Sequence, residues 1–224
     1  QSWPTTQIPY QWIGDKKTLW FRKEVTVPLQ FAGKPVAVLL DFQEALLFVD
    51  GKAYHGLDER HKEAFLSEKA KPRESFLLAV QSFSGRKRGI NTFNYAELVV
   101  LNRTARALYN GLTTIRELDR IVGHGTQESK DIHELIRRTL IFLKYFKPEG
   151  EEYPNAIDRA YKFLVTTLET EFKTNFPGLV HLVGHSHLDV AWLWTAKEAG
   201  QKAARTQSTV LRLMEQFADC KYTQ

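Results

Sequence analysis

The fold is decided by the stretch LVHLVGHSHLDVAW, residues 179–192. Its apolar beginning, 179–183, predicts a strand, and His185, His187 and Asp189 then recur at every second position. Because successive side chains of a strand alternate between its faces, we expect these three to point the same way from its carboxyl end. Imidazole and carboxylate are common zinc ligands, and a catalytic zinc site keeps one coordination position open. The stretch therefore predicts part of a metal site, although histidines near a strand end can also be plain hydrogen-bonded loop residues.

The spacing of the two histidines is shared by several classes of metallohydrolase. Amidohydrolase-type barrels and metallo-β-lactamases both use a His-x-His pair, and the second class needs a histidine directly after the aspartate, where this sequence has Val190. The whole string instead resembles the signature of glycoside hydrolase family 38, the zinc-dependent α-mannosidases, which reads His-Ser-His-x-Asp-x-x-Trp. Its positions are met here by His185, Ser186, His187, Asp189 and Trp192. The segment that follows, 193–206, is similar to the bacterial and cytosolic branch of that family.

The resemblance assigns roles to four residues of the stretch. It implies that His187 and Asp189 bind one zinc ion per active site, and that His185 lies beside these ligands without binding the metal. Trp192 is implied to form an apolar wall against the sugar ring, the alternative being a core tryptophan at the mouth of the first barrel strand. In a zinc amidohydrolase-like enzyme, which stays open as an alternative, both histidines would be ligands.

The resemblance also implies a reaction, the retaining hydrolysis of terminal α-mannosidic bonds in oligosaccharides. Such a reaction uses two carboxyl groups, one as acid and base and one as nucleophile, and a metal bound to the sugar hydroxyls adds orientation. In the family pattern the nucleophile, the acid/base and the remaining histidine ligand all lie beyond Gln224. We therefore expect an amino-terminal fragment of a longer enzyme that has no catalytic carboxyl and is inactive alone. The start at Gln1, without a methionine, agrees with this expectation.

Residues 177–224 predict the start of a catalytic domain. A long helix is expected from Thr195 to about Phe217, and 221–224 would begin the next strand. A strand, a site at its carboxyl end and then a helix form the opening βα unit of a parallel α/β (β/α) barrel. We expect Glu198 and Glu215 of the helix to be surface charges. Its apolar side is expected to comprise Ala199, Ala203, Val210, Leu211, Leu213 and Met214.

Residues 1–103 predict a β-sandwich. Short apolar runs recur at close spacing, and the Asp50-Gly51 pair between two of them is a strong hairpin signal. Several such strands with few helical patterns indicate a sandwich or jelly roll, and some resemble the galactose-binding-like jelly rolls that accompany many glycosidases. A non-catalytic carbohydrate-binding module stays open as an alternative for this domain. Its candidate sugar-stacking rings are Trp3, Tyr10, Trp12 and Tyr54.

Residues 104–176 predict an α-helical linker region. Apolar residues recur every three or four positions in successive segments, which is the period of amphipathic helices. Thr126 and Ser129 are the candidate N-caps of the second helix. The chain is thus expected to be multidomain, with a sandwich, a helical spacer and the first βα unit of a barrel.

The composition restricts the classes of partner. The 224 residues include 31 lysines and arginines against 26 aspartates and glutamates, and the dense basic run 86–88 is expected to be a solvated turn rather than a nucleic-acid surface. No apolar stretch is long enough to cross a bilayer, so we expect no membrane partner. The lone Cys220 forms no internal disulfide, which fits a cytoplasmic location. The expected partner is an α-mannoside oligosaccharide, and a homo-oligomer is compatible with the sequence.

Overall fold

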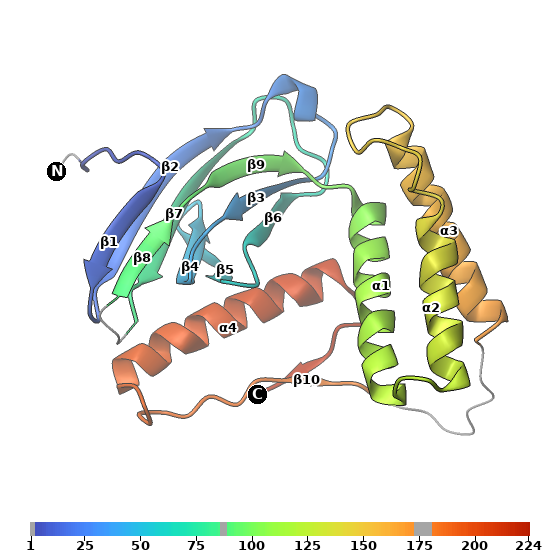
Figure 1. The fold of residues 1–224 in the computed structure, drawn as a ribbon. Coiled ribbons are helices and arrows are strands. Elements are labelled where there is room, and N and C mark those ends of the chain that lie inside the picture. Colours follow the sequence, from blue (N-terminus) through green and yellow to red (C-terminus); the bar gives the residue numbers. More distant parts are fainter. Residues whose placement is uncertain (1–2, 86–88, 173–180) are drawn as a thin grey trace. The chain divides into compact units, whose positions relative to one another are not determined.

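The computed structural model of the chain describes residues 3–85, 89–172 and 181–224 (Figure 1). It divides into two compact units, one of residues 1–100 and 180–224 and the other of residues 101–179. The first unit holds a β-sandwich and a short βαβ segment, and the second is helical. Within the described ranges, no helix is both long and apolar enough to cross a membrane. The basic run 86–88 lies outside these ranges.

The sandwich is built from antiparallel strands. Among the described residues, one sheet has the strand order β2-β7-β4-β5, a second has the order β6-β3-β9, and β1 pairs with β8. A short 3-10 helix, Leu29–Phe31, follows β2. The strands are β1 (Tyr10–Gly14), β2 (Thr18–Thr26), β3 (Val36–Leu40), β4 (Glu44–Val49), β5 (Lys52–Asp58), β6 (Glu63–Ser67), β7 (Ser75–Phe83), β8 (Gly89–Phe93) and β9 (Ala96–Val100).

The hydrophobic core of the first unit lies between the two larger sheets. In β7 the alternate residues Phe76, Leu78 and Val80 are buried, as expected for a strand with one face against a core. They belong to one cluster with Val36 and Val38 of β3 in the other sheet. The predicted sandwich is therefore confirmed.

The hairpin predicted at Asp50-Gly51 connects β4 to β5. The φ angles of Asp50 and Gly51 are 50° and 80°, in the left-handed region that a two-residue type I′ turn requires. The two strands pair antiparallel around the turn, with Leu46 opposite Gly56. Directly opposed residues share a face of the sheet. The register of this hairpin therefore determines that Leu46 and Gly56 lie on the same face.

The candidate sugar-stacking rings are mostly internal. Trp12 is 9% exposed and lies in the core, and Tyr10 packs against the same cluster. Tyr54 is half-buried, and its hydroxyl donates a hydrogen bond of 2.6 Å to the carbonyl of Phe65. Trp3, by contrast, is 51% exposed. Three of the four rings therefore supply apolar area to the sandwich core, as expected for most aromatic side chains of such a domain, and Trp3 is the one of the four that is exposed.

The helical unit consists of α1 (Arg103–Val122), α2 (Gln127–Leu140) and α3 (Tyr153–Thr170). The side chain of Asn102 caps α1, and Thr126, rather than Ser129, caps α2 by accepting a hydrogen bond from the Ser129 amide. The buried residues recur at helical spacing, as the sequence predicted. Those that form the apolar core cluster are Leu108, Ile115, Ile132, Leu135, Ile157, Ala160 and Leu164.

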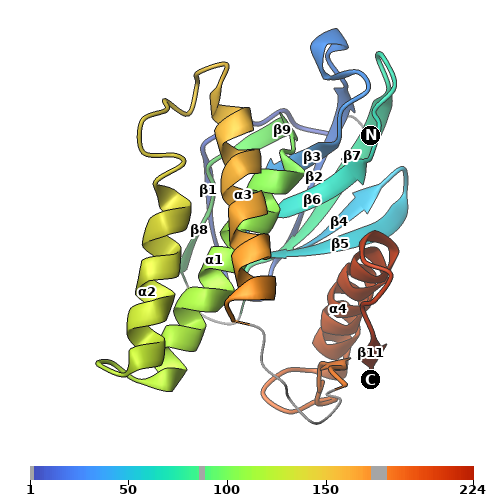
Figure 2. The same cartoon turned by 90° about the vertical axis from the view of Figure 1, so that its right-hand side faces the viewer.

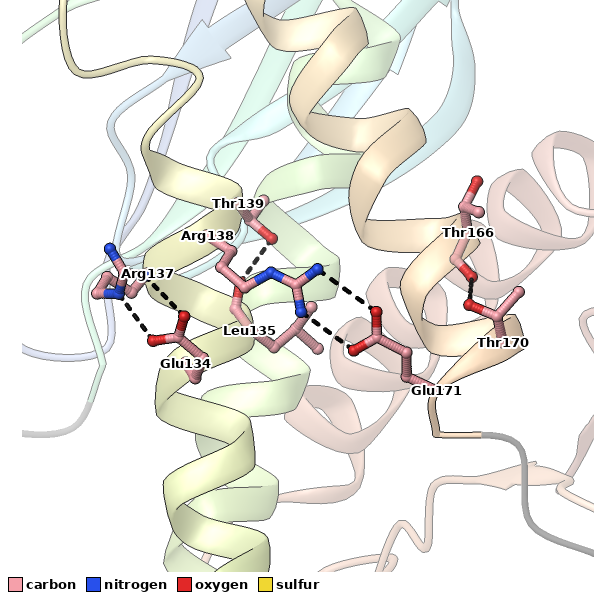
Figure 3. Close-up of polar contacts among 8 residues, drawn as sticks. All are labelled: Glu134, Leu135, Arg137, Arg138, Thr139, Thr166, Thr170 and Glu171. Carbon is pink, nitrogen blue, oxygen red and sulfur yellow. Dashed lines mark hydrogen bonds and ion pairs between the residues drawn. The ribbon is translucent and has the colours of Figure 1, made fainter.

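Polar contacts join these helices beside their apolar core. The Ser129 hydroxyl of α2 donates a hydrogen bond of 2.6 Å to the buried carboxylate of Asp119 in α1, and His133 Nε2 lies 3.0 Å from the other oxygen of that carboxylate. The Ser129 hydrogen bond, with the attraction of His133, holds the pKa of Asp119 below its usual value. At the other contact, Arg138 of α2 donates two hydrogen bonds, of 3.1 and 3.4 Å, to Glu171 just after α3 (Figure 3).

The last part of the chain returns to the first unit as a βαβ segment. It comprises β10 (Gly184–His185), α4 (Ala196–Gln216) and β11 (Tyr222–Thr223), and the two strands pair in parallel. The strand expected to begin within 221–224 is therefore present. The strand expected over 179–183 is wrong in extent. Positions 179 and 180 lie outside the described residues, 181–183 are not in a strand, and pairing with β11 is limited to Gly184 and His185.

Candidate functional site

The strand β10 ends in the first of the predicted site residues. His185 Nδ1 lies 3.1 Å from the carbonyl oxygen of Thr223 in β11. A carbonyl only accepts, so Nδ1 carries the proton of this hydrogen bond. The neighbouring strand thereby fixes the orientation of the His185 ring, which agrees with a residue that supports the site.

The two residues implied as metal ligands lie side by side in the loop after β10. His187 Nε2 is 3.0 Å from Asp189 Oδ1, and the two side chains are 74% and 43% exposed. We expected them to meet through strand alternation, whereas both lie in a loop after β10. Ala191, two residues after Asp189, has a left-handed φ of 56°.

This pair has donors that suit zinc. Two ligands bound about 2.0–2.1 Å from a tetrahedral zinc ion lie about 3.3 Å from each other, close to the 3.0 Å between His187 Nε2 and Asp189 Oδ1. A direct hydrogen bond between them accounts for that distance equally well. Among the residues that the structure describes, no group of three or more histidine, cysteine or acidic side chains forms a complete metal site. The pair can therefore supply part of a zinc site.

Trp192 lies beyond this pair and is open to solvent. Its side chain is 66% exposed, and its ring meets that of Trp194 edge to face, with 5.8 Å between the centroids. Trp194 is half-buried, and its Nε1 donates a hydrogen bond of 2.7 Å to the backbone carbonyl of Asp189. The indole of Trp194 thus holds the backbone at one of the implied ligands.

The helix α4 begins directly after this loop with a capping box. The Thr195 hydroxyl accepts a hydrogen bond from the Glu198 amide, and the Glu198 carboxylate accepts one of 2.6 Å from the Thr195 amide. Glu198 is only 9% exposed. Its prediction as a surface charge is wrong, because its carboxylate is needed at the helix start, while Glu215 is exposed as expected.

The face of α4 that meets the sandwich is polar rather than apolar. In both views α4 lies beside β5 (Figure 1, Figure 2). Of the residues expected on the apolar side, Ala199 is buried, Ala203, Val210 and Leu213 are half-buried, and Leu211 and Met214 are 56% and 42% exposed. Several side chains that contact β4 and β5 are charged or carry a hydroxyl group. They are spaced along α4 at alternating intervals of three and four residues. They are Lys202, Arg205, Thr209 and Arg212.

A cavity of about 1060 Å³ also lies within the sandwich unit, but none of its lining residues belongs to the loop of His187 and Asp189. Its walls are largely apolar and come from 3–8 and from strands such as β2 and β9. Trp3 and Trp20, which are 51% and 43% exposed, line it. The chemistry of the predicted site is therefore in the exposed loop and not in this cavity.

Both ends of the chain match known protein families. Residues 177–224 match the family described as "Glycosyl hydrolases family 38 N-terminal domain", and residues 1–108 match "Alpha-mannosidase, jelly roll domain". The second match identifies the sandwich as a jelly roll. The first contains every residue of the predicted signature.

Related sequences carry the same description. The chain is similar to Alpha-mannosidase 2C1 of Mus musculus, with 28% identity over 221 residues, and to Alpha-mannosidase 2C1 of Homo sapiens, with 27% identity over 217 residues. These matches cover 90% and 88% of this chain but 21% and 20% of the relatives. Alpha-mannosidase G of Dictyostelium discoideum is 24% identical over 229 residues, which cover 92% of this chain and 20% of that protein. The chain thus spans about a fifth of the length of these curated relatives. With one match before the helices and another after them, the chain is similar to the family 38 alpha-mannosidases at both of its ends.

Proposed function

We propose that this chain is part of a zinc-dependent retaining α-mannosidase that hydrolyses terminal α-mannosidic bonds of oligosaccharides. The observation that carries the proposal is the pairing of His187 Nε2 with Asp189 Oδ1 at 3.0 Å, in an exposed loop within the segment that matches family 38. A nitrogen and an oxygen donor at this separation suit a shared zinc ion. The names of the relatives support the substrate class.

Four residues, from His185 at the end of β10 to Trp192 in the loop, have distinct roles in this proposal. His187 and Asp189 hold the metal, and His185, oriented by the Thr223 carbonyl, supports them. When bound, zinc supplies a positive charge that orients the sugar hydroxyls. Trp192 offers an exposed apolar face, of the kind that packs against the carbon-bound hydrogens of a sugar ring.

The catalytic carboxyls are proposed to lie outside this sequence. Retaining hydrolysis needs a nucleophile and an acid/base about 5–5.5 Å apart, and Asp189 is here assigned to the metal. The curated relatives are about five times as long as this chain. We therefore propose that residues after Gln224 supply both carboxyls and the remaining histidine ligand, and that the 224-residue chain alone is inactive.

We also propose a cytoplasmic location for the protein. The 224 residues contain a single cysteine, Cys220, so no disulfide can form within them. This is the composition expected of a protein that works under reducing conditions.

The test uses the complete protein that contains this sequence. It should release the aglycone from an aryl α-mannoside, lose that activity when zinc is removed by a chelator, and regain it when zinc alone is restored. Proton NMR of the first product formed should show the α-anomer, because two inversions retain configuration. A β-anomer would contradict the retaining mechanism. Hydrolysis of cyclic amides in place of mannosides would favour the amidohydrolase-like alternative.

A further inference from the structure

We propose that the jelly roll positions the metal-binding loop, with Glu44 and Lys202 as positioning residues that act through Trp194 on the backbone of Asp189. This inference rests on the proposed function. It goes further in giving the jelly roll a part in the site, although none of its residues belongs to the family 38 signature.

The first step is a carboxylate that holds two cations. Glu44, at the start of β4, accepts a hydrogen bond of 3.2 Å from Lys202 Nζ and another from Arg205 Nη2, both on the same oxygen. The exposed fractions of the three side chains are 29%, 30% and 12%. Burial lowers the pKa of the Arg205 guanidinium, and the attraction of Glu44 opposes that shift. Because a half-buried cation depends on its partner, this contact ties α4 to one place on the sheet.

The second step leads from Lys202 to the site loop. Besides its bond to Glu44, the Lys202 ammonium lies over the Trp194 ring, 4.9 Å from the centroid, in cation–π geometry. Trp194 Nε1 in turn donates to the Asp189 carbonyl at 2.7 Å. Glu44, Lys202 and Trp194 thus form a continuous series of contacts that ends at the backbone of an implied metal ligand.

The third step is the close approach that permits this series. Gly56 in β5 has no side chain, and a Cβ there would lie 3.0 Å from the Arg205 carbonyl oxygen and 3.0 Å from Thr209 Oγ1. Its amide instead donates to Thr209 Oγ1 at 2.9 Å. One turn further along α4, the Arg212 guanidinium lies 5.0 Å from the centroid of the Tyr54 ring. The helix α4 therefore contacts the sheet at several positions along its length. Of these positions, Lys202 is the one that also contacts the loop.

The arrangement supplies a matched control. Arg212 docks α4 on β5 through the Tyr54 ring, whereas Lys202 docks the helix on Glu44 and also contacts Trp194 of the loop. Removing the charge of either residue weakens docking. Only the loss of Lys202 should also release the Asp189 backbone.

The experiment compares Lys202→Met, Lys202→Arg and Arg212→Met in the complete protein. Hydrogen exchange of a peptide spanning 186–195 is followed with and without added zinc, and zinc affinity is measured by competition with a chromophoric chelator. In Lys202→Met, exchange should rise by roughly 2- to 30-fold, the factor that corresponds to one cation–π contact, and zinc affinity should fall by about 10- to 100-fold. Lys202→Arg should retain most of both, and Arg212→Met should change neither.

Two results would overturn the positioning role. One is a folded Lys202→Met variant in which exchange across 186–195 equals that of the parent protein. The other is an equal change in Arg212→Met, which would mean that α4 docking alone matters. Glu44→Gln provides a second measurement, since it should also raise loop exchange while leaving Lys202 in place. Exchange without zinc reports on the loop even if the complete protein binds no zinc and cleaves no mannoside, so failure of the proposed function is distinguishable from failure of this inference.

Discussion

The backbone amide of Gly56 in β5 donates a hydrogen bond of 2.9 Å to the hydroxyl of Thr209 in α4. A strand amide that would otherwise point to solvent is thereby paired with a side chain 153 positions later in the sequence. The contact needs a glycine, because a Cβ at this position would meet both Thr209 Oγ1 and the Arg205 carbonyl at 3.0 Å. The surface of the sheet and the surface of the helix are therefore fitted to each other at this point.

Replacement of Gly56 by alanine should destabilise the chain by about 1–3 kcal/mol, the usual cost of forcing a methyl group into a packed contact. The urea midpoint of unfolding, followed by tryptophan fluorescence, measures the change. Gly200→Ala is the matched control, because a Cβ there meets nothing within 4 Å and the glycine lies inside α4. That variant should be more stable than the parent by about 0.5–1 kcal/mol. Equal midpoints for both variants would contradict the fit described at Gly56.

The two neighbouring histidines should respond differently to replacement in the complete protein. His187→Ala removes an implied ligand and leaves Asp189 without its imidazole partner, so bound zinc and mannosidase turnover should fall together. His185→Ala removes a residue that contacts the Thr223 carbonyl. It should lower affinity or activity by about 10- to 100-fold but keep most of the metal at saturating zinc. Metal content by mass spectrometry, alongside the rate, decides between them. Equal loss of zinc would contradict the assigned ligands, and full retention in His187→Ala would contradict the metal site.

Trp192 should matter for substrate and not for folding. Its side chain is 66% exposed, so Trp192→Ala should change stability by no more than about 0.5 kcal/mol. In the complete protein, kcat/KM for an aryl α-mannoside should fall by about 2- to 10-fold, with a smaller loss in Trp192→Phe, because an aromatic contact is worth about 0.5–1.5 kcal/mol beyond area burial. Tyr109→Ala, at an aromatic residue of α1 that is 70% exposed, is the control and should change neither quantity. Unchanged kinetics in Trp192→Ala would remove this residue from the sugar site.

Asp119 should make the helical unit sensitive to acid. The Ser129 hydrogen bond lowers the pKa of Asp119 in the folded state, so the carboxylate stabilises the fold above its unfolded pKa of about 3.9. That contribution is lost as the pH falls through the folded value. The difference in urea midpoint between the parent chain and Asp119→Asn should therefore be present at pH 7 and shrink below about pH 4. Asp158→Asn, on an exposed position of α3, is the matched control. A difference for Asp119→Asn that is constant from pH 7 to pH 3 would contradict this role.

The sandwich was predictable where local chemistry determines the backbone. Asp50 and Gly51 accept left-handed φ angles, so their turn and the register of β4 with β5 could be expected from the sequence. The strands β1, β6 and β8 were not predicted. Ile13 of β1 and Ile90 of β8 are opposite each other and are 69% and 61% exposed. Trp12 and Phe93 of the same two strands are buried, so apolar residues occupy both faces of the pair and leave no clear alternation of apolar and polar residues in the sequence.

The site was predictable in its residues and only partly in its geometry. The spacing of His187 and Asp189 anticipated their proximity, but both lie in a loop and not in the expected strand. The contacts of Lys202 could not be foreseen, because its partner Glu44 is 158 positions away. The polar face of α4 toward the sheet could not be foreseen either, because cations and hydroxyls on a helix are usually exposed to solvent and here they contact β4 and β5.

The long separation between Gly56 and Thr209 has a consequence during synthesis. At about 5–20 residues per second, a ribosome adds Thr209 about 8–30 s after Gly56. Leu46 faces the same side of the sheet as its opposed residue Gly56, and it is only 3% exposed once the chain is complete. During those seconds the newly made sheet carries an uncovered leucine and an unpaired strand amide. Until α4 emerges, other proteins can therefore bind the nascent jelly roll at this surface. A chaperone bound there would have to dissociate before α4 could dock and position the loop of His187 and Asp189.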